Sequence, residues 1–468
     1  MTEDIAFLSL LDVAERIRGR KISSEAVTRT LLDRIARFDD KLHSFTFMMT
    51  ESALAEAAQA DREIQAGFYR GPLQGVPVAV KDLLFTKGVP TGAGMELFSG
   101  FKPDFDATVV ERLRRAGAVI LGKLHMTEGA TVEHHPSLPR PNNPWRDGYF
   151  PGGSSSGSGV AVAAGFCYGA LGTDTGGSIR IPSASCGLSG IKPTWGRVSR
   201  HGLFPLSESL DHIGPMTRSA ADAAAILGVI AGADPLDPTA LGEPVPNYLR
   251  SLDDGIEGIR IGVDWAFATE NVDPATAAAI HEAAALFPVL GARIVPVTLP
   301  STKTLADDFI ALLVPEAAYS HRATFPAQAD RYGPGLRHML EGAAHFGTAD
   351  MVRAQQARAA FAGRLAALFR EVDLILLPTM PSTAFSWAEI DAMGPDFNAL
   401  MMDRLGRFTL MFNMACSPTL TLPSGFDAGG LPTSLQLAGP RLAEPLLCRA
   451  GFAFQRMTDF HTRHPTLA

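Results

Sequence analysis

The sequence predicts an α/β fold in which a large mixed sheet is covered by helices. Segments with helical spacing of apolar residues alternate with short β-branched runs, as where a helix over 107–116 precedes a strand in AVILGK. Hydrophobic residues make up 46% of the 468 residues, and the 45 glycines indicate many tight turns. No fixed-period repeat is present, so we expect a single domain over residues 1–468.

The elements follow a clear order. Residues 8–66 have helical spacing throughout, so we expect an N-terminal helical segment over about 1–66, with Ser23 and Ser24 as candidate caps. Residues 302–405 are rich in helical pattern and predict a cap-like insertion, although 373–381 within them has a strand-like composition. Further strands are expected at 75–85, 118–123, 168–173, 258–265, 418–426 and 433–439.

Charge and targeting features exclude several classes of protein. The formal net charge is -8 and no run of Lys and Arg occurs, which argues against nucleic acid and anionic membranes as partners. No apolar run approaches the ~20 residues that a membrane span needs, and the acidic, amphipathic start is unlike a signal peptide. The four cysteines are isolated, which favours buried thiols and a cytoplasmic protein.

Four short motifs suggest other chemistries, each with a reason against it. The phosphate-loop match in GAVILGKL has leucine where magnesium binding needs Ser or Thr, and its middle is a strand. A G-x-S-x-G match would make Ser155 a nucleophile, but a turn precedes it instead of a strand. The S-x-x-K match at 189–192 is followed by proline, and the histidines at 134–135 lack further metal ligands.

Three other features combine into a catalytic hypothesis: Lys81 after an apolar strand, the serine cluster PGGSSSGSG, and Ser178 in GTDTGGS. A buried lysine without a full carboxylate partner favours its neutral form, which can serve as the base for a serine, directly or through a second hydroxyl. The glycines let backbone N–H groups converge as an oxyanion hole. From local sequence alone, a surface Lys81 paired with Asp82 remains an open alternative.

At these residues the sequence resembles the amidase-signature family. The resemblance rests on GGSSSGSGVAVAAG at 152–165 and GTDTGGSIRIPSASCGLSGIKPT at 172–194, with RPNNPW and GLPTSLQLAGP flanking them. It extends from about residue 8 to about residue 455, and it implies a single domain with a large mixed sheet wrapped in helices. It also implies hydrolysis of a C–N bond through an acyl-enzyme without metal or cofactor.

The resemblance assigns roles residue by residue. It makes Ser178 the nucleophile, Ser154 a serine with a cis peptide bond, and Lys81 the base. It implies an oxyanion hole built from Thr175, Gly176, Gly177 and the N–H of Ser178. Ser156 departs from the family, which usually has glycine there, and the hydrogen bonding around Lys81 is therefore open.

The substrate is less defined. The resemblance implies that Met126, Gly129, Thr131 and His134 line the pocket, with 302–415 as its lid. We expect a small apolar or aryl amide, or a carbamate (urethane), acted on by a monomer or homodimer. The expectation comes from apolar side chains of the lid. Membership of the core would explain these side chains equally well. They are Phe309, Tyr319, Met401, Met402, Met411, Phe412 and Met414.

Two alternatives remain. The first is the glutaminase A subunit of a tRNA-dependent amidotransferase, which passes ammonia to a partner. Such proteins carry an acid just before the segment GRFTLMFN, where this chain has Gly406 and Arg407, which disfavours glutamine. The second is a non-catalytic scaffold, which the presence of all three triad residues disfavours.

Overall fold

The computed structural model describes residues 5–394 and 404–467. Within this part of the chain, 11 strands form one mixed sheet. Its parallel pairs are β2 with β3 and β4, and β7 with β8 and β9, while the other pairs are antiparallel. In sheet order the strands are β1 (Phe45–Met48), β3 (Val119–Leu124), β2 (Pro77–Lys81), β4 (Gly169–Thr173), β6 (Ile213–Thr217), β5 (Ser189–Lys192), β10 (Thr419–Phe426), β11 (Pro432–Ala438), β9 (Leu374–Pro378), β7 (Arg260–Val263) and β8 (Arg293–Pro296).

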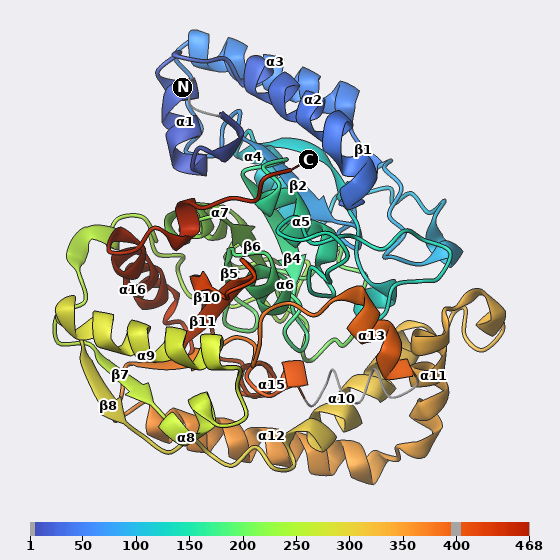
Figure 1. The fold of residues 1–468 in the computed structure, drawn as a ribbon. Helices are drawn as coiled ribbons and strands as arrows, with labels where there is room; N and C mark the ends of the chain where they lie inside the picture. Colours follow the sequence, from blue (N-terminus) through green and yellow to red (C-terminus); the bar gives the residue numbers. More distant parts are fainter. Residues whose placement is uncertain (1–4, 395–403, 468) are drawn as a thin grey trace.

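Helices surround this sheet, which confirms the predicted fold class (Figure 1). The helices α10, α11 and α12 lie together at the side of the molecule opposite α2 and α3. Their bounds are α1 (Leu10–Arg18), α2 (Ser24–Leu42), α3 (Thr50–Gln65), α4 (Thr108–Arg115), α5 (Ser156–Ala163), α6 (Arg180–Ser185), α7 (Ala220–Ile230), α8 (Trp265–Thr269), α9 (Pro274–Val289), α10 (Leu305–Ser320), α11 (Pro334–Gly342), α12 (Thr348–Leu368), α13 (Trp387–Met393), α15 (Leu410–Met414) and α16 (Glu444–Arg456).

The N-terminal segment is helical as predicted, with one exception. Ser23 caps α2 by accepting a hydrogen bond from the N–H of Ala26, while Ser24 is buried and donates to the carbonyl of Gly75. Residues 45–48 form the edge strand β1, which pairs antiparallel with β3. A four-residue strand between two long helices leaves little periodic signal, which is why the sequence did not reveal it.

The strand expected at 373–381, within the predicted cap-like stretch 302–405, is confirmed. Helices α10, α11 and α12 occupy 305–368, but β9 at 374–378 enters the sheet between β11 and β7. The helical stretch α10–α12 therefore ends at Leu368. Residues 395–403 lie outside the described residues. That the whole chain is one domain stays a prediction.

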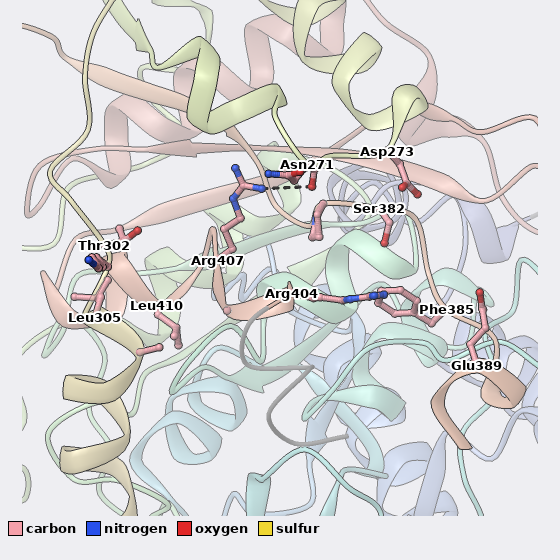
Figure 2. A pocket seen from close by; sticks show the side chains of 14 residues that line it. Asn271, Asp273, Thr302, Leu305, Ser382, Phe385, Glu389, Arg404, Arg407 and Leu410 are labelled. Atoms are coloured by element: carbon pink, nitrogen blue, oxygen red, sulfur yellow. Dashed lines mark hydrogen bonds between the residues drawn. The ribbon is translucent and has the colours of Figure 1, made fainter. Parts of the chain in front are cut away.

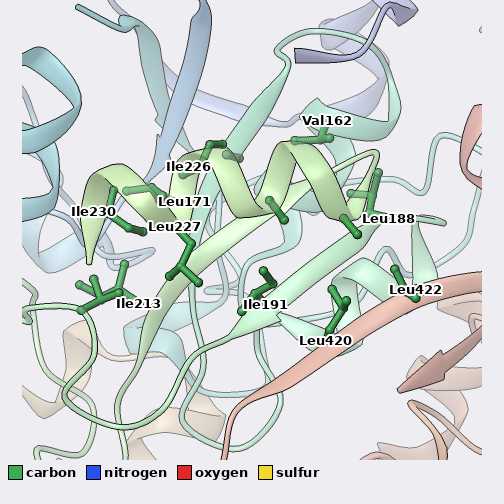
Figure 3. Packing of buried hydrophobic residues seen from close by; sticks show 14 of the residues in the cluster. Val162, Leu171, Leu188, Ile191, Ile213, Ile226, Leu227, Ile230, Leu420 and Leu422 are labelled. Carbon is green, nitrogen blue, oxygen red and sulfur yellow. The ribbon is translucent and has the colours of Figure 1, made fainter. Parts of the chain in front are cut away.

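The central strands are buried on both faces. The α7 helix packs over β4, β5 and β6 through side chains that interlock in Figure 3, including Ile226, Leu171 and Ile191. Each of these side chains is at most 1% exposed. Burial on both faces explains why these strands have continuous apolar sequences instead of alternating ones.

None of the helices among the described residues combines the length and the apolar composition that crossing a bilayer requires.

The close packing of β6 gives a stability prediction. A methyl group at Gly214 would overlap the carbonyl oxygen of Ile191, whose strand β5 pairs with β6, so Gly214→Ala should lower the free energy of unfolding by about 1–3 kcal/mol. Gly363, within α12, has no atom within 4 Å of the same position. Gly363→Ala should therefore stabilise by about 0.5–1 kcal/mol. Calorimetric melting would check both, and an unchanged melting temperature for Gly214→Ala would contradict the packing.

Candidate active site

Lys81 is the last residue of β2, and its side chain lies wholly inside the protein. Its Nζ donates to Ser154 Oγ at 2.6 Å and to Thr173 Oγ1 at 2.8 Å. Thr173 ends β4, which runs parallel to β2, so both strands deliver their last residues to the same edge of the sheet. The sequence analysis missed Thr173, although it belongs to the GTDTGGS motif.

Burial also decides the protonation of Lys81. Desolvation lowers the pKa of its ammonium to about 7, while the charges of Asp211 and Asp174 oppose the shift. A substantial fraction of neutral amine is therefore present near neutral pH. The alternative pairing with Asp82 is not formed, because Asp82 pairs with Lys123 at 3.5 Å.

The serine cluster divides into three different environments. The peptide bond between Gly153 and Ser154 is cis, in agreement with the family resemblance. Ser155 Oγ donates to the carbonyl of Thr173 at 3.3 Å and accepts from its N–H at 3.2 Å. Ser156, the residue that departs from the family, lies 3.1 Å from Nε2 of His134. Of the three hydroxyls, only that of Ser154 contacts the lysine.

The loop after β4 is organised by the Asp174 carboxylate. It accepts from the N–H of Gly177 at 2.9 Å and from the N–H of Ile179 at 3.1 Å. Burial alone would raise the pKa of Asp174, but the guanidinium of Arg180 lowers it well below its ordinary value. Gly177, with φ 141, permits this turn.

The hydrogen bond from Gly177 to Asp174 changes the expected composition of the oxyanion hole. Because the N–H of Gly177 already donates to Asp174, it is a weaker candidate donor than predicted. The N–H groups of Thr175, Gly176 and Ser178 have no acceptor among the described residues. These three are the remaining candidates for binding a developing oxyanion.

Ser178 opens into a cavity of about 610 Å³. Its Oγ has no hydrogen-bond partner among the described residues, while Lys81 and Ser154 are fully buried. The cavity is mainly apolar, with walls from α6, α10 and α11, and the ring of Phe309 lies against Gly176. Its apolar lining comprises Val132, Phe150, Ile181, Leu206, Phe309, Ile310, Leu313, Val314, Met339, Phe346 and Leu405.

The predicted substrate-binding residues are only partly at this cavity. Thr131 lines it, but Met126 is fully buried in the core, and Gly129 faces Leu336 and His321 instead. Neither of these two residues lines the cavity, so their predicted contact with substrate stays a prediction. His134 is partly buried beside Ser156 and is not among the residues that line the cavity.

Of the apolar lid residues, Phe309 lines the cavity. Tyr319 is 67% exposed on the outer face of α10, so it faces solvent. Met411, Phe412 and Met414 belong to the core, as the alternative interpretation held. Met401 and Met402 lie outside the described residues.

A second cavity, of about 870 Å³, shares Ala306 and Gly406 with the first and is more polar (Figure 2). Arg407 points into this region, where its guanidinium donates to the carbonyls of Phe267 and Glu270, each at 2.8 Å. Residues 406–407, where the sequence analysis expects an acid in a glutaminase subunit, therefore present no carboxylate to the cavity that Ser178 lines.

The competing motifs have structural roles. Lys123 lies on β3, where its Nζ donates to the carbonyl of Leu84 and to Thr91. Ser189 and Lys192 are both on β5, so the S-x-x-K match has no helix. Within the described ranges, no group of three His, Cys, Asp or Glu side chains could hold a metal ion.

A family model described as Amidase matches residues 26–448. The chain belongs to the amidase family. A Mycobacterium tuberculosis protein whose amidase name, AmiD, is itself provisional is 45% identical over 98% of this chain and 96% of its own length. The A subunit of the glutamyl-tRNA(Gln) amidotransferase from a Geobacter species is 36% identical over 99% of this chain and 100% of its own.

A solved bacterial aryl acylamidase of the amidase-signature family has the same fold, with a TM-score of 0.89 and 25% identity over 99% of this chain and 100% of that chain. The protein is thus similar to a hydrolase that cleaves aryl amides and to part of an amidotransferase. Membership of the family makes it an amidase-signature hydrolase.

The separate environments of the serines predict different effects of their removal. Ser154→Ala removes the hydroxyl that contacts Lys81 and should lower kcat by about 10²–10⁴-fold. Ser156→Ala, two residues away, should remain close to wild type, because its hydroxyl contacts His134. Hydrolysis of a chromogenic anilide measures both, and equal losses in the two variants would contradict the assignment of Ser154.

Proposed function

We propose that this amidase hydrolyses small apolar or aryl amides, with carbamates (urethanes) as a second substrate class, through an acyl-enzyme on Ser178. The observation that carries the proposal is that Ser178 lines the apolar cavity together with Gly153, the residue before Ser154, whose hydroxyl contacts the buried Lys81. A ligand in the cavity can place a carbonyl group at Ser178, and the proposed proton relay runs from Ser178 through Ser154 to Lys81.

The proposed reaction begins with neutral Lys81 taking a proton from Ser154 as Ser154 takes one from Ser178. The Ser178 oxygen attacks the carbonyl carbon, and the resulting oxyanion accepts hydrogen bonds from the candidate N–H groups of Thr175, Gly176 and Ser178. As the tetrahedral intermediate collapses, the C–N bond breaks and the amine leaves with the proton from the relay. Water then cleaves the ester by the same route, regenerating the free Ser178.

The lining of the cavity supports an uncharged substrate. Its described walls include one carboxylate, Asp307, which is exposed at the mouth, and two exposed histidines, His338 and His345. A charged group placed deeper would lose its hydration without gaining a partner, which costs several kcal/mol. An apolar or aromatic group would instead gain about 25 cal/mol per Å² of buried surface.

The alternative function is the glutaminase A subunit, which the similarity to the Geobacter protein supports. Against it stands the absence of a carboxylate from residues 406–407 to bind the ammonium of glutamine. The monomeric or homodimeric state and the cytoplasmic location remain predictions, as does the use of a small molecule as the sole partner.

A substrate panel tests the proposal. Apolar p-nitroanilides and anilide carbamates should be hydrolysed, and glutamine should be poorer by roughly a hundredfold or more, because the described walls offer its ammonium only Asp307, which is exposed at the mouth. A fluorophosphonate should label Ser178 covalently, and Ser178→Ala should lose both labelling and hydrolysis. Preferred hydrolysis of glutamine would favour the amidotransferase function, and wild-type turnover by Ser178→Ala would overturn the nucleophile.

The lowered pKa of Lys81 predicts a pH dependence. Because the base must be neutral, kcat/KM should rise with pH through about 7 and then level off. Lys81→Ala should abolish this rise and lower the rate near neutral pH by about 10²-fold or more. Lys123→Met, which removes another buried lysine, should keep the rise near 7 because Lys123 does not contact Ser154. A rise that disappears only in Lys123→Met would contradict the assignment.

A further inference from the structure

Asp211 is a buried carboxylate outside the predicted triad that lies beside the reacting loop. Its side chain is almost fully buried, and Oδ1 accepts a hydrogen bond from Thr175 Oγ1 at 2.6 Å. Its other oxygen accepts from the N–H groups of Leu206 and Ser207, at 2.9 and 3.1 Å. We propose that Asp211 is a positioning residue that couples the candidate oxyanion loop to the electrostatics of Lys81.

Sheet register brings Asp211 to this place. Strands β4 and β6 pair antiparallel, with Thr173 opposite Ile213. The ladder continues for one more pair, because Asp174 and His212 exchange both backbone hydrogen bonds, at 2.9 and 3.1 Å. The next pair in register is Thr175 and Asp211, whose side chains bond to each other. The loop that carries Ser178 is thus fixed at its first residue by a cross-strand partner.

The contacts of Asp211 extend to the substrate cavity. Leu206, whose N–H donates to Asp211, lines the cavity together with Thr175. Ser207 Oγ in turn donates to Glu316 on α10, the helix that provides much of the apolar wall. One carboxylate therefore holds the oxyanion loop and the 206–207 segment in a fixed relation.

The charge of Asp211 is a second observation. Within the described residues Asp211 makes no salt bridge, although it is buried. A buried carboxylate without an ion pair is costly, and a neutral amide could accept a hydrogen bond from Thr175 equally well. Its negative charge favours the protonated form of Lys81 and so opposes the effect of burial. This offset keeps the pKa of the base near the operating pH, where general-base catalysis is most effective.

The other charged groups near Lys81 and Asp211 have partners or shifted pKa values of their own. Asp174 also acts on Lys81, but its carboxylate is paired with Arg180 at 2.9 Å. Arg200 acts on Asp211, and its guanidinium pairs with Glu208 at 3.1 Å. The remaining titratable groups beside Asp174 are His212, whose pKa burial lowers well below its ordinary value, and Lys192, whose pKa burial lowers to about 7.

The test uses the pH dependence of fluorophosphonate labelling, which requires no knowledge of the substrate. Asp211→Asn turns an amide NH2 either toward Thr175 or toward the N–H groups of Leu206 and Ser207, all of which need an acceptor, so it should slow labelling about tenfold to a hundredfold through misplacement of the loop. The labelling rate plotted against pH should have a rising limb, where Lys81 loses its proton. Asp211→Asn should also move this limb to lower pH, by on the order of one unit, because a lysine without its neighbouring anion loses its proton more easily. A merely structural role would slow the reaction without moving the limb.

Matched variants separate the two effects. Thr175→Val removes the hydrogen bond and keeps the charge, so it should slow labelling and leave the limb in place. Asp222→Asn changes another buried aspartate, on α7, that does not act on Lys81, and should match the wild type in both readouts. If Asp211→Asn does not fold, Asp211→Ser should move the limb in the same direction.

The outcomes distinguish this inference, which rests on the proposed function, from that function itself. If wild-type protein is not labelled at Ser178, the proposed function and the role of Asp211 both fail. If the wild type is labelled but the limb of the Asp211 variants stays at the wild-type pH, only the electrostatic role of Asp211 is overturned. Wild-type labelling by Thr175→Val would overturn the positioning role.

Discussion

Asp174 and Arg180 form an ion pair that is completely shielded from solvent, and the geometry around Ser178 depends on it. The carboxylate receives backbone N–H groups from the loop, while the guanidinium donates to the carbonyl of Thr409 at 2.9 Å and to Gln436 at 3.1 Å. A buried pair is stabilising only when every remaining donor and acceptor is satisfied, as these are. The pair therefore fixes the nucleophile loop against α6, α15 and β11 at once.

The two aspartates that act on Lys81 have different roles because their hydrogen-bond and charge partners differ. Asp174 is neutralised by Arg180 and acts mainly as a template for the loop. Asp211 has hydroxyl and amide donors, and burial raises its pKa to about 6. Lys81 itself has two hydroxyl partners, which satisfy its hydrogen bonds without stabilising its positive charge as a carboxylate would. The site therefore keeps a base that is neutral enough to act.

The sequence indicated the fold class, several strands and most helices, but not β1, β5 or β6, and the Lys81–Ser154 contact was expected from the family resemblance. Periodicity identifies elements such as α4 and β3, and the glycine-serine motifs locate the loop that carries Ser178. These motifs did not reveal that the N–H of Gly177 donates to Asp174. Glycine adopts many backbone conformations, so the direction of its N–H cannot be inferred from the sequence. Asp211 was missed because it contacts Thr175 through strand register, and register depends on pairing between distant segments.

The substrate wall was the least predictable part, and the reason lies in helix geometry. On α10, Phe309 contacts Gly176 while Tyr319 is exposed, although both are aromatic residues of the same lid helix. Ten positions correspond to about 80° less than three full turns, so their side chains leave different faces. Which face meets the cavity depends on how Glu316 anchors the helix to Ser207 and Ser209. The apolar character of the site therefore follows from the docking of α10, and composition alone cannot supply it.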